Sequence, residues 1–161
     1  MKQRGKSLFT LSTLLASFFG AAMIAATFAY FNYKFAEYKF IDFKEWVFYE
    51  QKEIFKPSDE NYIIVFYSSK ESGTAELLSQ TNLKYKILAI DYYNQAFTNT
   101  QSTTFLRSGT KTSLSFIQRF NIYESPSIFF IKKTKEQIYK QDSMILKLDN
   151  LHELSNKIRD L

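Results

Sequence analysis

The sequence predicts an α/β domain, a mixed sheet with helices on both faces, behind one N-terminal transmembrane helix. Three observations support this fold class. A long uncharged stretch lies near the N-terminus, short β-branched and aromatic runs then alternate with helix-favouring segments, and 45% of the 161 residues are hydrophobic and 18% aromatic. Such a composition is too apolar for an intrinsically disordered chain. The length allows one domain and one small additional element.

The same composition excludes several kinds of site. The chain contains no cysteine and a single histidine, His152. It therefore has no disulfide framework, thiolate zinc site, iron–sulfur cluster or cysteine nucleophile, and it cannot build a multi-histidine metal site. We expect neither a metal nor a cofactor.

The net charge of +5 is unevenly distributed along the chain. No acid precedes Glu37, and three of the 21 basic residues lie before the uncharged stretch: Lys2, Arg4 and Lys6. The remainder is close to neutral, and its one tight basic group surrounds a predicted turn: Lys132, Lys133 and Lys135. Nucleic-acid binders instead gather basic groups on one face between aromatics. We expect a solvated turn here and no nucleic-acid partner.

Residues 8–31 are predicted to span a membrane. They carry no charge and, at ~1.5 Å rise per residue, are long enough to cross a hydrocarbon core of ~30 Å. The basic residues before them place residues 1–7 in the cytoplasm by the positive-inside rule, and the rest of the chain outside it. Because the basic residues are mostly lysine and Phe, Ile, Tyr and Asn are abundant, we expect an AT-rich bacterial genome. The predicted location is the bacterial inner membrane, with a periplasmic domain.

A cleaved signal peptide is the alternative reading of this segment. Residues 8–19 would then form its apolar region and Gly20, Ala21 and Ala22 its cleavage zone. Apolar sequence continues beyond that point through residues 23–28, which favours a retained span.

Residues 32–59 are predicted to form a juxtamembrane segment that is mostly helical. Its large apolar residues approximate one helical face: Phe40, Phe43, Val47 and Ile54. Pro57 then marks a break before the domain at residues 60–161.

Within the domain, apolar runs predict strands at residues 62–67, 86–92, 127–131 and 137–139. Helix-favouring sequence covers residues 74–80, and a second helix ends at residues 116–120. The clearest predicted helix is the last, because five apolar residues fall on one face: Leu148, Leu151, Leu154, Ile158 and Leu161. Asn150 and Glu153 have the spacing of a capping pair at its start.

Two of these stretches resemble the thioredoxin family. Residues 64–67, Ile-Val-Phe-Tyr, stand where that family's central strand leads into its active-site turn. Residues 120–131, Phe-Asn-Ile-Tyr-Glu-Ser-Pro-Ser-Ile-Phe-Phe-Ile, resemble its loop and strand around a cis-proline. The predicted order of elements is also similar. The resemblance implies a thioredoxin-like domain over residues 60–161.

The resemblance also implies that this domain has lost the family's chemistry. Four residues stand at the redox motif, where the family has Cys-Gly-Pro-Cys: Ser72, Gly73, Thr74 and Ala75. Disulfide exchange needs an attacking thiolate and a resolving thiol, and neither is present. A nucleophilic Ser72 would need a positioned base, and the one histidine lies in the distant C-terminal segment. We therefore expect no enzyme, and we expect Ser72 or Thr74 to cap a helix.

The second motif implies a cis peptide at the loop formed by Ser125, Pro126 and Ser127. In this family the adjoining loop offers backbone groups to an extended peptide; a purely structural turn is the alternative.

Residues 94–115 are predicted to form a polar insertion, because they are dominated by Asn, Gln, Thr and Ser. Long insertions are usually functional loops or mobile segments. As a partner-binding loop, its candidate contact residues are Asn99, Thr104, Phe105 and Arg107.

Together these features predict a non-catalytic, membrane-tethered, thioredoxin-like interaction module. We expect protein partners in the periplasm or inner membrane, within an envelope assembly such as a flagellar motor, secretion or cytochrome-maturation complex. A peptide-holding chaperone or degenerate oxidoreductase partner is the alternative.

Overall fold

The computed structural model describes residues 10–37, 39–71, 73–149 and 153–158. It divides into two compact units, residues 1–38 and 39–161, which are considered separately below.

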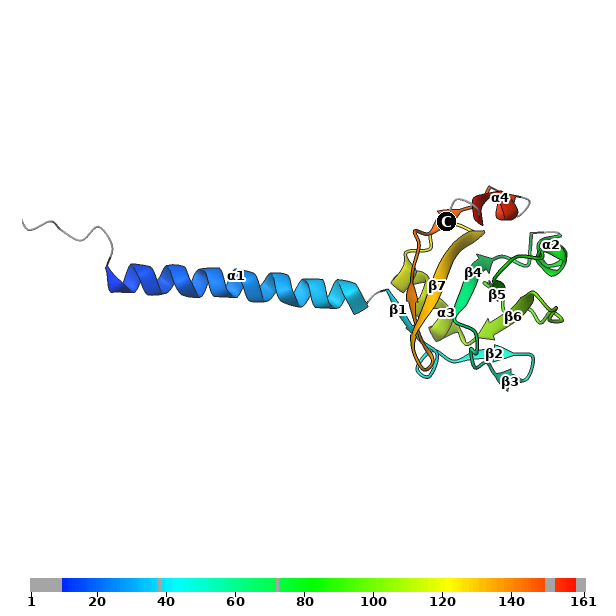
Figure 1. Ribbon diagram of the computed structural model, residues 1–161, viewed down its shortest axis with the longest axis horizontal. Coiled ribbons are helices and arrows are strands. Elements are labelled where there is room, and N and C mark those ends of the chain that lie inside the picture. The colour runs from blue at the N-terminus through cyan, green and yellow to red at the C-terminus, as the bar shows by residue number, and fades with distance from the viewer. Residues whose placement is uncertain (1–9, 38, 72, 150–152, 159–161) are drawn as a thin grey trace, which may run out of the picture. The chain divides into compact units, whose positions relative to one another are not determined.

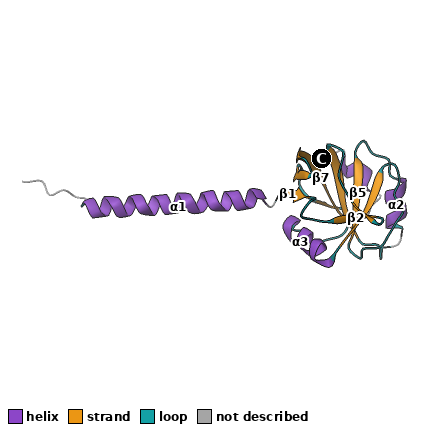
Figure 2. Ribbon diagram, turned by 90° about the horizontal axis from the view of Figure 1, so that it is seen from below, coloured by secondary structure: helices purple, strands orange, loops and turns teal. Residues whose placement is uncertain are grey.

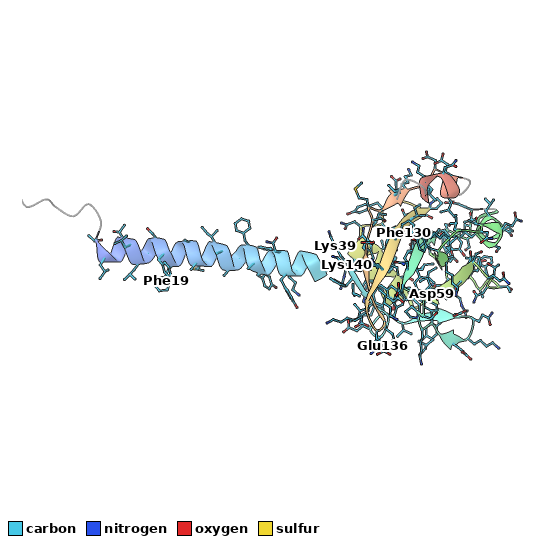
Figure 3. All side chains as sticks on the ribbon, in the orientation of Figure 1. Phe19, Lys39, Asp59, Phe130, Glu136 and Lys140 are labelled. Atoms are coloured by element: carbon cyan, nitrogen blue, oxygen red, sulfur yellow. The ribbon has the colours of Figure 1, made fainter. Side chains whose placement is uncertain are left out.

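The first unit is the helix α1, Leu11–Glu37, of 27 residues. Its segment Leu11–Lys34 is long and apolar enough to cross a membrane, with a mean hydropathy of 1.8. Its large apolar side chains are exposed along the helix, as at Phe19 (Figure 3). The Ser17 and Thr27 hydroxyls donate to backbone carbonyls one turn earlier, at 2.9 and 2.8 Å. Such internal pairing is what a lipid environment requires of polar groups. The predicted apolar helix is confirmed.

The second unit is a mixed sheet with helices (Figure 1). Its elements in chain order are β1 Phe40–Asp42, β2 Phe48–Glu50, β3 Glu53–Ile54, β4 Asn61–Tyr67, α2 Thr74–Gln80, β5 Lys86–Asp91, β6 Thr103–Ser108, α3 Thr110–Phe120, β7 Ser127–Lys135, β8 Ile138–Gln141, β9 Leu146–Lys147 and α4 Leu154–Ile158. The strand order is β1-β8-β7-β4-β5-β6-β2-β3, and β9 pairs with β7. β4, β5 and β6 are parallel to one another, whereas the other pairings are antiparallel.

The sheet curls so that its two ends approach each other. β1 and β2 are separated by only residues 43–47, yet they lie near opposite ends of the strand order. Phe43, in that short connection, contacts both ends. Its ring centroid is 5.5 Å from that of Tyr139 on β8 and 5.8 Å from that of Phe48 on β2.

Strand β4 is buried on both faces and separates two apolar cores, as its sequence predicts. Tyr62, Ile64 and Phe66 belong to the first core, which α3 covers through Phe116 and Phe120. The intervening residues of β4 belong to the second core, which contains Leu78 of α2 and Leu154 of α4. Figure 2 shows α3 and α2 on opposite sides of the strands. The predicted sheet with helices on both faces is confirmed.

The prediction for residues 32–59 is wrong beyond Glu37, because β1, β2 and β3 replace the expected helix. The helix-like spacing of the apolar residues is accidental. Phe43, Phe48 and Phe55 are buried in the first core, whereas Ile54, assigned to the same helical face, is 53% exposed. Pairing with β6 and β8 decides the conformation of this segment, because tertiary contacts override weak local periodicity.

The prediction that residues 94–115 form a polar insertion is also wrong. It contains β6 and the start of α3, and only residues 92–102 form a connection. Strand β6 pairs in parallel with β5, from Ile87 with Thr103 to Ile90 with Leu106. Because β6 begins with two threonines, its sequence looks polar and the strand was not predicted. Thr103 is nevertheless buried, and its hydroxyl donates to the Leu78 carbonyl at 2.9 Å.

The C-terminal helix is shorter than predicted where the structure describes it. Leu148 is buried but precedes α4, whose described bounds are Leu154–Ile158. The backbone N–H of Leu148 instead donates to the Pro126 carbonyl at 2.9 Å. The predicted capping pair falls on Asn150, outside the described residues.

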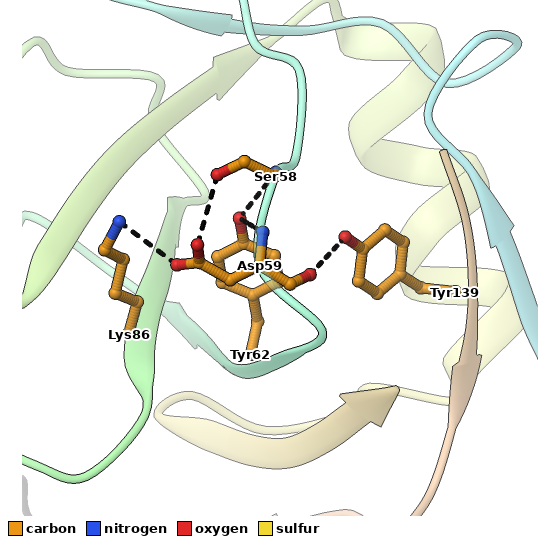
Figure 4. A network of polar contacts seen from close by, with 5 residues as sticks. All are labelled: Ser58, Asp59, Tyr62, Lys86 and Tyr139. Carbon is orange, nitrogen blue, oxygen red and sulfur yellow. Dashed lines mark hydrogen bonds and ion pairs between the residues drawn. The ribbon is translucent and has the colours of Figure 1, made fainter. Parts of the chain in front are cut away.

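A network of two buried tyrosines fixes the break before β4 (Figure 4). The Tyr62 hydroxyl accepts from the backbone N–H groups of Ser58 and Asp59, at 2.9 and 3.0 Å. The Tyr139 hydroxyl donates to the Asp59 carbonyl at 2.5 Å, and the Asp59 carboxylate pairs with Lys86 of β5 at 3.0 Å. Burial, followed by the neighbouring Tyr62 and Asp59, raises the pKa of Tyr139. This phenol therefore remains a donor at neutral pH.

Replacing Tyr139 by Phe should destabilise the domain by about 1 kcal/mol, because the Asp59 carbonyl loses its donor. Trp46, the single tryptophan, packs against Phe116 and Phe120, so its fluorescence can follow unfolding of the full chain in detergent. The matched control is Tyr123→Phe, at a side chain that is 87% exposed. Equal unfolding midpoints for the two variants would contradict this role of Tyr139.

Candidate functional site

The first group of predicted site residues lies at the start of α2. Ser72 is outside the described residues. Gly73 precedes the helix with φ of 81°, in the left-handed region that glycine adopts without strain. Thr74 and Ala75 are buried, at 5% and 7% exposure. Among the residues described, no side chain caps this helix. The prediction that Thr74 caps it is wrong, because Thr74 is the first residue of the helix itself and Gly73 is at the cap position.

The second group forms a firmly held loop between α3 and β7. The Ser125–Pro126 peptide is cis, as the resemblance implies. The Ser127 hydroxyl donates to the Glu124 carbonyl at 2.5 Å, and the Pro126 carbonyl accepts the bond from Leu148. The Ser125 hydroxyl is buried and has no hydrogen-bond partner within the described part of the chain.

The predicted partner-binding loop is largely structural. Phe105 is 4% exposed in the second core, and Thr104 lies on β6 opposite Leu88. Asn99 holds the 92–102 connection against the sheet, because its amide donates to the Glu50 carboxylate at 2.5 Å and accepts from the Phe105 N–H at 2.8 Å. Arg107 donates to the Gln51 carbonyl in the turn between β2 and β3. These contacts position the segment within the domain.

A pocket instead lies at the carboxyl ends of β4 and β5, beside Ser125. Its volume is about 390 Å³, within the ~300–1,000 Å³ typical of ligand sites. Ligands commonly bind at this end of parallel strands. The lining is mainly apolar and aromatic: Phe66, Ser68, Tyr92, Tyr93, Leu114, Ile117, Ile122, Tyr123, Glu124 and Ser125.

Exposed rings give this pocket its chemical character. Tyr92, Tyr93 and Tyr123 are 46%, 43% and 87% exposed. The Tyr92 and Tyr93 rings meet edge to face with centroids 5.0 Å apart, and the ammonium of Lys70 lies 4.1 Å from the Tyr93 centroid. Exposed tyrosines present flat apolar surface together with a hydroxyl, a combination enriched at protein interfaces.

Asp91 organises the two loops that carry these rings. Its side chain is 1% exposed, and its two carboxylate oxygens accept from the backbone N–H groups of Ser69, at 2.8 Å, and Gln95, at 2.7 Å. The loop after β4 is thereby joined to the loop after β5. Asp91 acts as a positioning residue, because it does not line the pocket itself.

Tyr67, the last residue of β4, is buried in the second core, and its hydroxyl has no partner among the described residues. Burial, and then the charges of Asp91 and Glu76, raise the pKa of Tyr67 well above its usual value. This phenol is therefore protonated at neutral pH and is not a general base.

This pocket was not predicted from the sequence. Asp91 and Tyr92 stand there at the end of a predicted strand, and Tyr123 lies in the stretch that resembles the cis-proline loop. An available signal was the consecutive polar and aromatic residues directly after a buried parallel strand. Among the residues described, no group of three or more His, Cys, Asp or Glu could hold a metal ion.

No family model and no curated protein matches this chain.

Replacing Asp91 by Asn should lower the free energy of unfolding by about 2 kcal/mol, because two hydrogen bonds to a buried carboxylate are lost or weakened. Asp142→Asn is the matched control, since Asp142 is exposed. Trp46 fluorescence during urea unfolding provides the measurement. A stability for Asp91→Asn equal to that of the control would contradict the positioning role.

Proposed function

We propose that this chain is a non-catalytic, membrane-tethered interaction module with a thioredoxin-like domain. In this proposal α1 anchors the domain on the outer side of a bacterial inner membrane, where it is a structural or scaffold subunit of an envelope assembly. The observation that carries the proposal is the pocket of exposed tyrosines beside the Ser125–Pro126 loop.

The arrangement of elements supports the thioredoxin-like part of the proposal. The order β4-α2-β5, followed by α3, the β7–β8 hairpin and α4, is the order that the resemblance implies, with β6 added before α3. The pocket lies where the end of β4 meets the Ser125 loop, the two regions that carry the resemblance in sequence.

The chemistry of the pocket favours binding over catalysis. The chain has no thiol, and the described residues that line the pocket include neither a histidine nor a lysine. The carboxylate of Glu124, at its rim, is paired with Lys147. The Ser125 hydroxyl remains available as a buried donor or acceptor, and a bound backbone group would satisfy it. A pocket with exposed aromatic rings around a few polar groups is suited to binding a peptide segment of another protein.

Replacing Tyr93 by Ala should reduce partner binding by about tenfold or more, because truncating an aromatic residue at an interface centre commonly costs 1–2 kcal/mol or more. The tagged full chain, crosslinked in intact cells and analysed by mass spectrometry, provides the measurement. Tyr49→Ala is the matched control, since Tyr49 on β2 is 41% exposed and Tyr93 is 43% exposed, and Tyr49 does not line the pocket.

The crosslinked partners also separate the two binding functions. A fixed set at constant stoichiometry supports a scaffold subunit, whereas many unfolded clients held transiently support the peptide-holding alternative. Partner recovery that is equal for Tyr93→Ala and Tyr49→Ala would refute the pocket as the binding site.

The membrane orientation yields a separate prediction. The basic residues before α1 favour a cytoplasmic N-terminus, so a reporter enzyme fused after Leu161 should be active only outside the cytoplasm. A fusion before Met1 serves as the control and should show the opposite pattern. Release of the chain as a shortened soluble protein would instead support the cleaved signal peptide.

A further inference from the structure

The strands at the pocket exclude one common way of binding a peptide, the addition of a strand to a sheet edge. β4 is paired on both sides, with β5 and β7, and β5 is paired with β4 and β6. At the start of β7, Ser127 lies opposite Phe66 on one side and Lys147 on the other. These strands therefore have no free edge at the pocket, and a bound segment cannot extend the sheet there.

The charges around the pocket favour an uncharged segment. The described residues that line it include one charged group, the Glu124 carboxylate, which is paired with Lys147. The Lys70 ammonium lies 4.1 Å from the Tyr93 centroid, but Lys70 is not among the lining residues. Sites for phosphorylated or acidic motifs gather several arginines, and a single lysine does not form such a cluster.

The pocket offers hydroxyl groups more than free carbonyl groups. The carbonyls of three lining residues already accept hydrogen bonds within the domain: Ser68 from the Glu71 N–H at 3.2 Å, Ile117 from the Ile122 N–H at 3.0 Å, and Glu124 from the Ser127 hydroxyl at 2.5 Å. Hydroxyl groups, in contrast, come from five lining residues: Ser68, Tyr92, Tyr93, Tyr123 and Ser125. A hydroxyl can rotate to donate to a carbonyl. A segment with many carbonyls and few N–H groups matches this lining.

Proline supplies that combination. A proline residue has a carbonyl but no N–H, and the polyproline II helix has no internal hydrogen bonds, so its carbonyls remain free to accept. Such helices dock in grooves lined by aromatic side chains. The pocket provides a connected set of rings, because the Tyr92 centroid lies 6.3 Å from that of Phe66 and 5.0 Å from that of Tyr93.

We propose that the pocket binds a proline-rich segment of a protein partner in the polyproline II conformation. This inference rests on the proposed interaction function and specifies its ligand. The tyrosine rings pack against the proline rings, and the buried Ser125 hydroxyl, which has no partner among the described residues, donates to a carbonyl of the segment. Because a polyproline II helix is already ordered before it binds, little conformational entropy is lost.

Peptide binding to the full chain tests this inference. The protein is reconstituted into nanodiscs, and the fluorescence anisotropy of a fluorescein-labelled peptide of three Pro-Pro-Ala repeats is measured in a titration, with the signal from empty nanodiscs subtracted. The control peptide has serine at every proline position, so its length and number of backbone carbonyls are the same. The proline peptide should bind about tenfold more tightly, because each proline reduces the conformational entropy that the free peptide loses.

Single substitutions locate the bound peptide. Tyr93→Ala should weaken binding of the proline peptide about tenfold, and Ser125→Ala about threefold, because one hydrogen bond is lost. Tyr49→Ala is the control, since Tyr49 does not line the pocket, and its affinity should equal that of the unmodified chain. Trp46 fluorescence verifies that each variant is folded.

Three results would overturn the inference: no binding of the proline peptide, equal affinity for the two peptides, or equal affinity of Tyr93→Ala and Tyr49→Ala. Crosslinking in cells separates this failure from that of the proposed function. If any of these results is obtained while recovery of the cellular partners still depends on Tyr93, the proline-rich ligand is refuted and the proposed function stands. If partner recovery is also independent of Tyr93, both are refuted.

Discussion

The closure of the curled sheet around Phe43 is the contact on which the rest of the domain depends. The connection between β1 and β2 is short, and Phe43 within it packs against β8 at one end of the strand order and β2 at the other. This packing encloses the first core, whose aromatic residues then continue in contact from Phe48 through Phe116 to Phe129. Without it, β1 and β2 would be short edge strands with little surface to bury, and such strands are marginal alone. The Tyr62–Tyr139 network supports the same closure, because it joins the start of β4 to β8 through Asp59.

The pocket follows from that closure. Phe66, the residue before the last of β4, belongs to the first core and also lines the pocket, so packing in the core holds this part of the lining. Leu114 and Ile117 of α3 form another part of the lining, and the rest comes from loops that polar groups hold in place. Asp91 joins the loops after β4 and β5, and Ser127 and Leu148 hold the loop before β7. A preorganised pocket of this kind loses little conformational entropy when a partner binds.

A segment of this fold could be predicted from the sequence when its own residues determine its structure, and not when distant strands determine it. The strands β4, β5 and β7 could be predicted because their apolar runs are buried on both faces, and the anchor because its length and lack of charge are sufficient. Strand β6 was missed, since a Thr-rich segment becomes a strand only when β5 and β2 flank it. Residues 40–55 were misassigned for a similar reason, because their burial is decided by β6 and β8. The roles of Asp91 and Asn99 rest on bonds to residues 22 and 49 positions away, which no local pattern reveals.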